Sequence, residues 1–374
     1  MSNAHHVISM PVWGERYLDM FLNVSLPSQL SPGNLPAFAH PRSCTYRLYT
    51  FRDDGVLLDA APAVRHLRRH ATVEIIVLPE SFRVHVISDK FGGMEFAHRH
   101  SLLWVMESPD RVLIPMLSDL VFSDGALYAV DKVIGEGAQA AVMTTPRGVL
   151  EAVGPLLTGL LQNGVLTVSP RTLYGMIFAN QLPSFGATIW GSVPSNPWPN
   201  HLQWEVEDEG SFHHTYHPYP IMLRAHAGSP DVEGTMDGNW VYRLVDDPSR
   251  LHIFDNSDEM CVIELSPRDY LADDLIDEPA TVISAASYFF KYRPSPLQME
   301  VFRRPLRYYT RDPGSAWQSR MAESRRVVES VISVVDILMA KEREMKASGD
   351  PVSLYAFRKP SPRPASLRLR INAC

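Results

Sequence analysis

The chain has few cysteines and no long apolar run. Its cysteines, Cys44, Cys261 and Cys374, lie far apart and form no C-x-x-C pair. This spacing excludes a disulfide-rich scaffold and disfavours a structural zinc site, so we expect reduced thiols without a special role. No apolar run reaches the about eighteen residues that a membrane span needs, and the N-terminus lacks the apolar core of a secretory signal. The expected location is therefore cytoplasmic, with no membrane span.

Positive charge is also in short supply. Lysine and arginine number 35 against 42 aspartate and glutamate, which leaves a formal net charge of -7 at pH 7. Surfaces that bind nucleic acid are normally positive, so we expect no nucleic-acid partner. The composition, 45% hydrophobic and 21% charged, is that of an ordinary globular protein. At 374 residues, one elaborated domain or two closely packed domains are both possible.

Strand and helix patterns alternate through the first 160 residues. Strand patterns cover His6–Val12, Tyr46–Phe51, Thr72–Leu78, Val112–Leu117 and Gln139–Met143. Helical patterns begin at Glu15 and cover Ala61–Arg69, Leu127–Ile134 and Arg147–Leu161. Alternation at this pace predicts an α/β fold with a mixed, mostly parallel sheet flanked by helices.

Carboxylates follow the apolar strand pattern that ends at Leu117. Asp119 comes two residues later, and Asp124 with Gly125 comes shortly after it. In open α/β sheets, ligands bind in the crevice at the carboxyl ends of the strands, so acids at this place suggest a metal or polar-ligand site. Asp and Gly also end strands because they make turns, and the local sequence leaves both interpretations open.

Several loop segments follow one another in a characteristic order. They are Pro11-Val12-Trp13-Gly14, Pro27-Ser28-Gln29-Leu30, Pro32-Gly33-Asn34, a strand that ends at Thr50, and Ser118-Asp119 followed by Ser123-Asp124-Gly125. This layout resembles the nucleotide-diphospho-sugar transferase fold, the GT-A class of glycosyltransferases. The resemblance covers roughly residues 7–160 and lies in the layout more than in a diagnostic motif.

The resemblance implies a nucleotide-sugar donor, an acceptor of unknown identity and direct displacement of the sugar. Val12, Trp13, Gly14, Thr50 and Ser123 would line the nucleotide pocket. The chain would then be a glycosyltransferase with a GT-A-like sheet.

The resemblance further implies a divalent cation, Mn²⁺ or Mg²⁺, held against the diphosphate by Asp119 and Asp124. The class carries Asp-x-Asp at this strand end, whereas this chain has Leu117-Ser118-Asp119. This departure puts metal dependence in question. It also motivates an alternative function, a GT-A-like domain that has lost catalysis and binds a nucleotide or a protein.

Proline and aromatic residues become frequent after residue 180. The concentration of prolines between Pro183 and Pro230 predicts a long irregular middle. Aromatic residues within 185–200 either form platforms for sugar rings or wedge the loop into the core. We expect four regions: a nucleotide-sugar-binding α/β half (5–180), an irregular acceptor-side half of the same cleft (181–313), a long helix (314–347) and a flexible tail (348–374).

Candidate catalytic residues lie in the predicted acceptor half. An inverting transferase needs a base that takes the proton from the acceptor hydroxyl, and Asp237, Asp258 and His217 are the candidates. Asp258 falls in a hairpin-like connection between predicted strands at 251–254 and 261–265. Ordinary turn chemistry explains each aspartate equally well.

Histidines cluster in two places. Three of them, His213, His214 and His217, lie within five residues, and His98 and His100 form an H-x-H upstream. Imidazole suits zinc, iron and copper, so a histidine-rich metal-dependent hydrolase is a third hypothesis. The chain has no HExxH motif, and clustered histidines are more often solvated or capping groups.

The C-terminal part combines a basic aromatic segment with a long helical pattern. Arginines between residues 293 and 307 suit either a diphosphate or an acidic neighbour. The pattern over Ala316–Met345 predicts one long helix whose apolar face packs across the sheet or onto a second subunit, so a homodimer is one expected arrangement. The tail from Pro351 is rich in Pro and Arg, and we expect it to be poorly ordered.

Overall fold

The computed structural model describes residues 2–83, 90–230, 232, 236–237 and 240–348. A seven-stranded sheet with the order β11-β6-β10-β4-β1-β2-β3 forms its centre. Its strands are β1 (His5–Pro11), β2 (Cys44–Thr50), β3 (Thr72–Val77), β4 (Arg111–Pro115), β6 (Ala140–Met143), β10 (Tyr219–Leu223) and β11 (Leu251–Ile253). Among these strands only β10 runs antiparallel to its neighbours. The predicted mixed, mostly parallel α/β sheet is confirmed.

Helices cover the sheet, so its central strands are buried along nearly their whole length. Every residue of β2 is buried, as expected for a parallel strand that packs on both faces. The helix α4 (Arg52–Ala60) packs against β3, and α7 (Lys90–Met106) packs against β1 and β4. Since the chain moves one way from β1 to β3 and returns the other way to β4, right-handed crossovers place these two helices on opposite faces.

The remaining helices of the first part lie in the loops that connect these strands. They are α1 (Glu15–Met20), the π-helix η1 (Phe21–Ser25), α2 (Leu26–Gln29), α3 (Leu35–Phe38), α5 (Pro62–Leu67) and α8 (Ala126–Gly135). One continuous core cluster joins their apolar side chains to the main sheet. The loop helices therefore hold the strand ends in fixed positions.

A second sheet crosses the boundary between the two predicted halves. It has the order β5-β12-β7, with β5 (Leu120–Phe122), β12 (Val262–Ser266) and β7 (Arg147–Val149). Its formation corrects two predictions. The helix predicted from Arg147 begins only at Leu150 (α9, Leu150–Thr158), because residues 147–149 pair with β12. The strands at 251–253 and 262–266 do not form a hairpin, because β11 joins the main sheet.

A third sheet occupies much of the predicted irregular middle. It has the order β13-β9-β8, with β8 (His201–Val206), β9 (Gly210–Thr215) and β13 (Leu306–Tyr309). Residues 187–200 form only turns and isolated bridges, but the chain beyond them is regular. The prediction of a long irregular middle was therefore wrong from residue 201 onward, where Leu202, Trp204 and Val206 alternate as buried residues of one strand.

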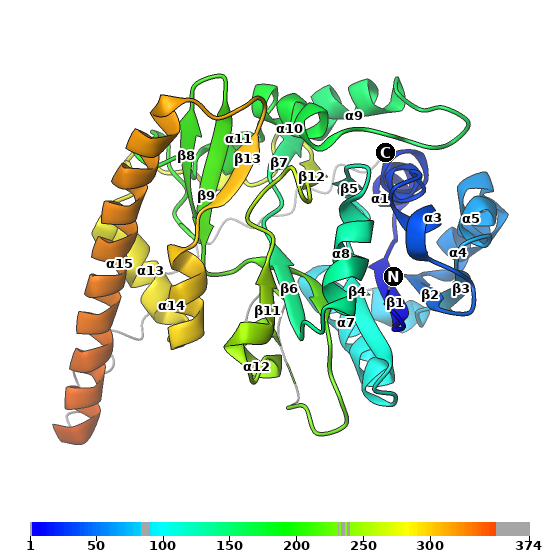
Figure 1. Ribbon diagram of the computed structural model, residues 1–374, viewed down its shortest axis with the longest axis horizontal. Helices are drawn as coiled ribbons and strands as arrows, with labels where there is room; N and C mark the ends of the chain where they lie inside the picture. Colours follow the sequence, from blue (N-terminus) through cyan, green and yellow to red (C-terminus); the bar gives the residue numbers. More distant parts are fainter. Residues whose placement is uncertain (1, 84–89, 231, 233–235, 238–239, 349–374) are drawn as a thin grey trace.

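Helices α13 (Val282–Lys291), α14 (Pro296–Arg303) and α15 (Ser315–Ser348) pack beside the third sheet (Figure 1). The long C-terminal helix is thereby confirmed. Its apolar residues Val328, Val331, Ile332 and Val335 are buried against this sheet and α13. The apolar face that suggested a second subunit is thus used within the chain.

Shorter helices complete the fold, namely α10 (Pro170–Ala179), α11 (Pro183–Gly186), α12 (Trp240–Leu244), η2 (Pro248–Arg250) and η3 (Ala272–Asp274). Cys44 and Cys261 are buried free thiols. Within the described ranges, no helix has the length and apolar character needed to cross a membrane. Cys374 and the tail predicted to be flexible lie outside the described residues, apart from Ser348.

Candidate functional site

The main sheet has a topological switch point between β1 and β4. The chain passes from β1 to β2 and β3 on one side, and it then returns as β4 on the other side of β1. Ligands of open α/β sheets bind at such a point, outside the carboxyl ends of the strands. Val12–Gly14 follow β1 directly, and Leu117–Asp119 follow β4. The strand order therefore places two predicted site segments on either side of the switch point.

Three predicted nucleotide-pocket residues lie at the end of β1. The Val12 amide is buried and donates to the carbonyl oxygen of Tyr49 at 2.9 Å, which extends the sheet by one residue. The Trp13 ring is half-buried, with its centroid 6.1 Å from that of Phe51. Gly14 has φ of 81° and donates its amide to Asp54 Oδ2 at 2.8 Å. Here the chain turns at Gly14, and Trp13 stays partly exposed at the strand end.

The other two predicted pocket residues are buried. Thr50 ends β2 with no exposed surface, so its side chain supports the edge from within the core. Ser123 is also fully buried: its amide donates to the Cys261 carbonyl at 2.9 Å, and its own carbonyl accepts from Asn34 Nδ2 at 3.0 Å. Thr50 lies with the residues at the ends of β1 and β2, whereas Ser123 links internal loops.

Asp119 lies within electrostatic reach of several side chains at the switch point. Burial raises the pKa of Tyr17 to about 12, and the nearby Asp119 carboxylate adds to this effect. Burial also raises the pKa of Tyr219 well above its ordinary value, again with Asp119 and Glu264 contributing. The Tyr219 hydroxyl donates to the Pro115 carbonyl at 3.0 Å, which ties β10 to the end of β4. Tyr17 and Tyr219 thus both lie within electrostatic reach of Asp119 and Glu264.

A cation completes this cluster. Arg147 Nη2 lies 3.1 Å from Glu264 Oε2, and the guanidinium lies 5.7 Å from the centroid of the Tyr270 ring. Desolvation lowers the pKa of Arg147, but Glu264, Tyr270 and Asp119 outweigh it and raise that pKa above its ordinary value. Arg147 therefore carries its charge permanently beside the predicted diphosphate end of the crevice.

Asp124 does not join Asp119. The Asp119 carbonyl accepts from the Leu265 amide at 3.1 Å, whereas Ser123, next to Asp124, pairs with Cys261 at the other end of β12. The two aspartates therefore flank opposite ends of β5. The Asp124 carboxylate accepts the Gly33 amide at 2.7 Å, so it fastens a loop.

The implied divalent cation does not fit this donor set. The first acid of the triplet is replaced by Leu117, Asp124 lies at the far end of β5, and the Glu264 carboxylate is paired with Arg147. In the part of the chain that the structure describes, no group of three or more His, Cys, Asp or Glu side chains could hold a metal ion. A cation shared by Asp119 and Asp124 is therefore not what these residues provide.

Two of the three candidate catalytic residues meet. His217 Nδ1 donates to the backbone carbonyl of Asp237 at 3.2 Å, and the His217 ring packs edge-on against Tyr292, with their centroids 4.3 Å apart. Asp237 itself is exposed. It also contributes to the raised pKa values of Tyr219 and Tyr288, which places its carboxylate near both phenols. Asp237 and Asp119 thus share Tyr219 as an electrostatic neighbour.

Asp258 lies apart from them in an ion pair. Its two carboxylate oxygens accept from Arg171 Nε and Nη2 at 2.9 and 2.8 Å, and Arg171 also contacts Asp312 at 2.6 Å. This bidentate pair connects α10 to the loop between β11 and β12. In the structure, Asp258 pairs with Arg171 and so holds α10 against this loop. The catalytic role predicted for Asp258 stays a prediction.

The clustered histidines of β9 are buried rather than solvated, whereas His100 of the upstream H-x-H is exposed. His213 and His214 have no exposed surface and point to opposite faces of β9, as neighbours in a strand must. His213 Nε2 lies 2.9 Å from Ser211 Oγ, and His214 Nδ1 donates to the Phe302 carbonyl at 2.8 Å. These contacts explain the histidines of β9 as core residues, and the described part of the chain offers no metal-binding group for the hydrolase hypothesis.

The basic aromatic segment pairs with acidic neighbours. Arg303 Nε lies 3.0 Å from Glu329 of α15, and Arg307 Nη2 lies 2.7 Å from Asp255. Two roles were open to these arginines, binding a diphosphate or pairing with an acidic neighbour. Arg303 and Arg307 pair with acidic neighbours within the chain. The diphosphate role is thereby left to other cations.

Sequence reasoning missed Arg147, Glu264 and Tyr219 as site residues. Arg147 was placed in a helix and Tyr219 in an irregular segment. Glu264 carried a usable signal, because a charged residue within the apolar strand Val262–Ser266 is rarely buried without a partner. That signal alone does not name the partner, which is 117 residues away in sequence.

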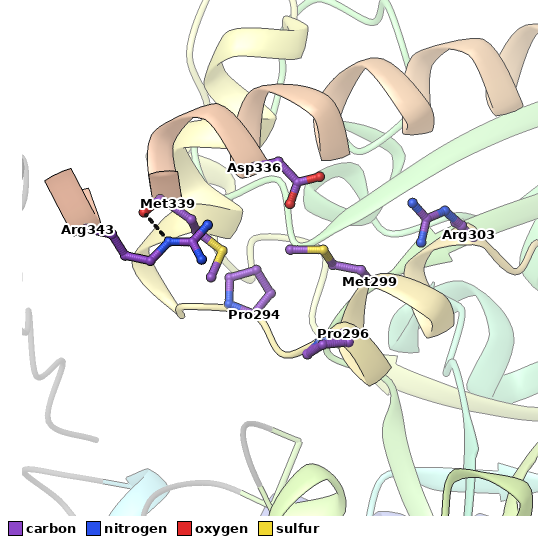
Figure 2. A pocket seen from close by; sticks show the side chains of 7 residues that line it. All are labelled: Pro294, Pro296, Met299, Arg303, Asp336, Met339 and Arg343. Carbon is purple, nitrogen blue, oxygen red and sulfur yellow. Dashed lines mark hydrogen bonds between the residues drawn. The ribbon is translucent and has the colours of Figure 1, made fainter. Parts of the chain in front are cut away.

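One surface hollow lies between α14 and α15 (Figure 2). It has a volume of about 240 Å³ and is lined by Pro294, Pro296, Met299, Arg303, Asp336, Met339 and Arg343. Ligand pockets for small molecules usually have about 300–1,000 Å³. The hollow is smaller than that and includes none of the predicted site residues, so it does not compete with the strand edge as the functional site.

No protein-family model and no curated protein sequence matches the chain. Among solved structures, a mannosyltransferase from Pyrobaculum calidifontis in complex with GDP-Man and Mn²⁺ shares 10% identity over 95% of this chain and 82% of that chain, with a TM-score of 0.32. Mouse xyloside xylosyltransferase 1, in its apo form, shares 13% identity over 49% of this chain and 70% of that chain, with a TM-score of 0.22. Similarity at this level assigns neither a family nor a function.

Proposed function

We propose that the protein is a glycosyltransferase that moves a sugar from a nucleotide-sugar donor to an acceptor. One observation carries this proposal: Val12–Gly14 and Asp119 lie on either side of the β1/β4 switch point, at the carboxyl edge of the sheet. This is where an open α/β sheet binds a nucleotide. The tyrosine hydroxyls and carboxylates around Asp119 suit the many hydroxyl groups of a sugar.

In this proposal, the donor lies over the ends of β1, β2 and β4. The half-buried Trp13 offers an aromatic surface for the nucleotide base, supported by Phe51 behind it. Asp119 accepts hydrogen bonds from hydroxyl groups of the ribose. Arg147 lies on the same edge, where the leaving diphosphate gains negative charge in the transition state.

The acceptor lies on the side of β10. Asp237 is exposed there, and among the described residues its carboxylate has no ion-pair partner, so it can take the proton of an attacking hydroxyl. His217 holds the backbone of Asp237 through the bond from Nδ1. Asp237 is thus the proposed base and His217 its positioning residue.

Nucleotide binding provides the first test. UDP, GDP, CDP, ADP and dTDP, each with Mn²⁺ and each with EDTA, are added to the protein, and the thermal midpoint is measured. A ligand that binds the native state raises the midpoint by mass action. We expect at least one of the five to raise it. A panel without any shift would contradict the proposed donor site.

The Asp119→Ala variant tests the site itself. Losing an acceptor that bonds sugar hydroxyls through a charged oxygen should weaken binding about tenfold or more, and the midpoint shift should shrink accordingly. Glu329→Gln serves as the control, because this carboxylate lies on α15 and pairs only with Arg303 among the described residues. An unchanged shift in Asp119→Ala would place the nucleotide elsewhere.

A binding module without catalysis is the second candidate. The observation that favours it is Leu117, an apolar side chain at the strand end where the resemblance implies an acid. Release of free nucleotide from the matching sugar nucleotide separates the two candidates. Turnover that falls in Asp237→Asn supports the transferase, whereas tight binding without turnover supports the module.

A further inference from the structure

The crevice holds a cation that is anchored by the tertiary structure. Arg147 begins β7 and lies directly opposite Glu264 in the parallel pairing of β7 with β12. Arg147 Nη2 and Glu264 Oε2 lie 3.1 Å apart, and the two side chains differ in exposure. The Glu264 side chain is 9% exposed, and that of Arg147 is 32% exposed. Glu264 is therefore the buried member of the pair, and about a third of the Arg147 side chain remains exposed.

Asp119 and Arg147 lie at opposite edges of the same small sheet. The Leu265 amide donates to the Asp119 carbonyl at 3.1 Å on one edge of β12, while Arg147 pairs with Glu264 on the other. Only the width of β12 separates their strands, about 4.7–4.9 Å on each side. Asp119 is also among the charges that raise the pKa of Arg147, so the two side chains lie within electrostatic reach of each other.

A guanidinium suits a diphosphate for two reasons. Its planar fork donates pairs of hydrogen bonds to phosphate oxygens, and its charge does not depend on pH in the physiological range. The carboxylates of Asp119, Asp124 and Glu264 do not assemble a metal site. Asp119 and Asp124 flank opposite ends of β5, and Glu264 is paired with Arg147. The described donor set thus offers an organic cation where a metal ion was expected.

We propose that Arg147, positioned by Glu264, binds the diphosphate of the nucleotide donor in place of a divalent cation. This inference rests on the proposed glycosyltransferase function, because it assigns the charge partner of the same donor site. It predicts that a nucleoside diphosphate binds in the presence of EDTA. It also predicts that Arg147 contributes to binding of the diphosphate but not of the corresponding nucleoside.

The test uses the full chain and the nucleoside diphosphate that gives the largest midpoint shift in the panel of five. Dissociation constants are measured by calorimetry for that diphosphate and its nucleoside, in EDTA and in Mn²⁺. We expect Arg147→Gln to weaken diphosphate binding about tenfold or more and to leave nucleoside binding unchanged. Because Arg147→Gln alone leaves Glu264 without its cation, the double variant R147Q/E264Q removes both charges together and keeps the fold testable.

The double variant R303Q/E329Q is the matched control, because it removes a similar ion pair between α14 and α15. It should bind the diphosphate like the wild type. Strict dependence of wild-type binding on Mn²⁺, or wild-type affinity in R147Q/E264Q, would overturn the role of Arg147 while leaving the proposed function standing. Absence of any shift across the panel would overturn both.

Discussion

Acidification to about pH 4.5 should remove most of the folding stability, because buried histidines stay neutral in the folded protein. His98, His213 and His214 are each at most 1% exposed. Burial lowers the pKa of His98 to about 3 and that of His214 to about 4, and it holds the pKa of His213 well below its ordinary value. The fold therefore excludes three protons that the unfolded chain accepts.

The sign of the pH dependence follows from the protonation of these histidines in the folded and the unfolded state. Above pH 6.5, the ordinary pKa of histidine, these imidazoles are neutral in both states and contribute no pH dependence. Below it the unfolded chain takes up protons that the folded chain refuses, so the free energy of unfolding falls as the pH falls. Each histidine lowers it by about 1.4 kcal/mol per pH unit, and three lower it by roughly 4 kcal/mol per unit. Total stabilities are about 5–15 kcal/mol, so unfolding near pH 4.5–5 is the expected result.

Urea unfolding at several pH values between neutral and 5 measures this dependence. In the His98→Gln variant the slope of the unfolding free energy against pH should be smaller by about 1.4 kcal/mol per pH unit. His226→Gln, at an exposed position, should keep the wild-type slope. If His98→Gln also keeps that slope, His98 is protonated in the folded state and the explanation fails.

The Gly210→Ala substitution should destabilise the protein by roughly 2–6 kcal/mol, through overpacking and a strained backbone together. Gly210 begins β9 with φ of 134°, which side-chain-bearing residues rarely adopt. A Cβ atom at this position would lie 2.0 Å from the carbonyl oxygen of Tyr308 in the paired strand β13. That oxygen belongs to the backbone of the strand that pairs with β9, so it cannot move away cheaply.

Gly137→Ala separates the two contributions. Gly137 also has positive φ, 88°, but a Cβ atom there would have no neighbour within 4 Å. It should cost only the backbone term, about 1–2 kcal/mol, in the same urea unfolding experiment. Equal losses in the two variants would mean that β9 and β13 adjust freely and that their close approach does not stabilise the third sheet.

The first part of the fold was predictable from local pattern. Apolar runs such as Val112–Ile114 have no alternative to burial on both faces, and the helical patterns between them leave a parallel sheet as the packing solution. Asp119 and Val12–Gly14 could be placed at a strand edge for the same reason. These predictions depend on patterns among residues within about ten positions of each other, and such local patterns can be read directly from the sequence.

The two main failures have different causes, and one of them is pairing across a long sequence separation. Arg147–Val149 has an acceptable helical pattern, yet it forms a strand because β12 lies beside it. The proline count around Pro183–Pro230 hid the alternation of Leu202 and Trp204 in β8, whose partner β9 follows immediately. Local propensity is a weak preference, and tertiary contacts override it.

By itself, the sequence determined the α/β class, the edge at which Asp119 and Trp13 surface, and the long helix α15, because hydrophobic periodicity and turn residues act locally. Only the tertiary structure decided which charges meet there. It separated Asp124 from Asp119, joined Arg147 to Glu264, and brought His217 to Asp237. Electrostatic partners depend on distance in space. That distance is set by the pairing of β10 with β4 and of β12 with β7, strands that lie more than a hundred residues apart in sequence.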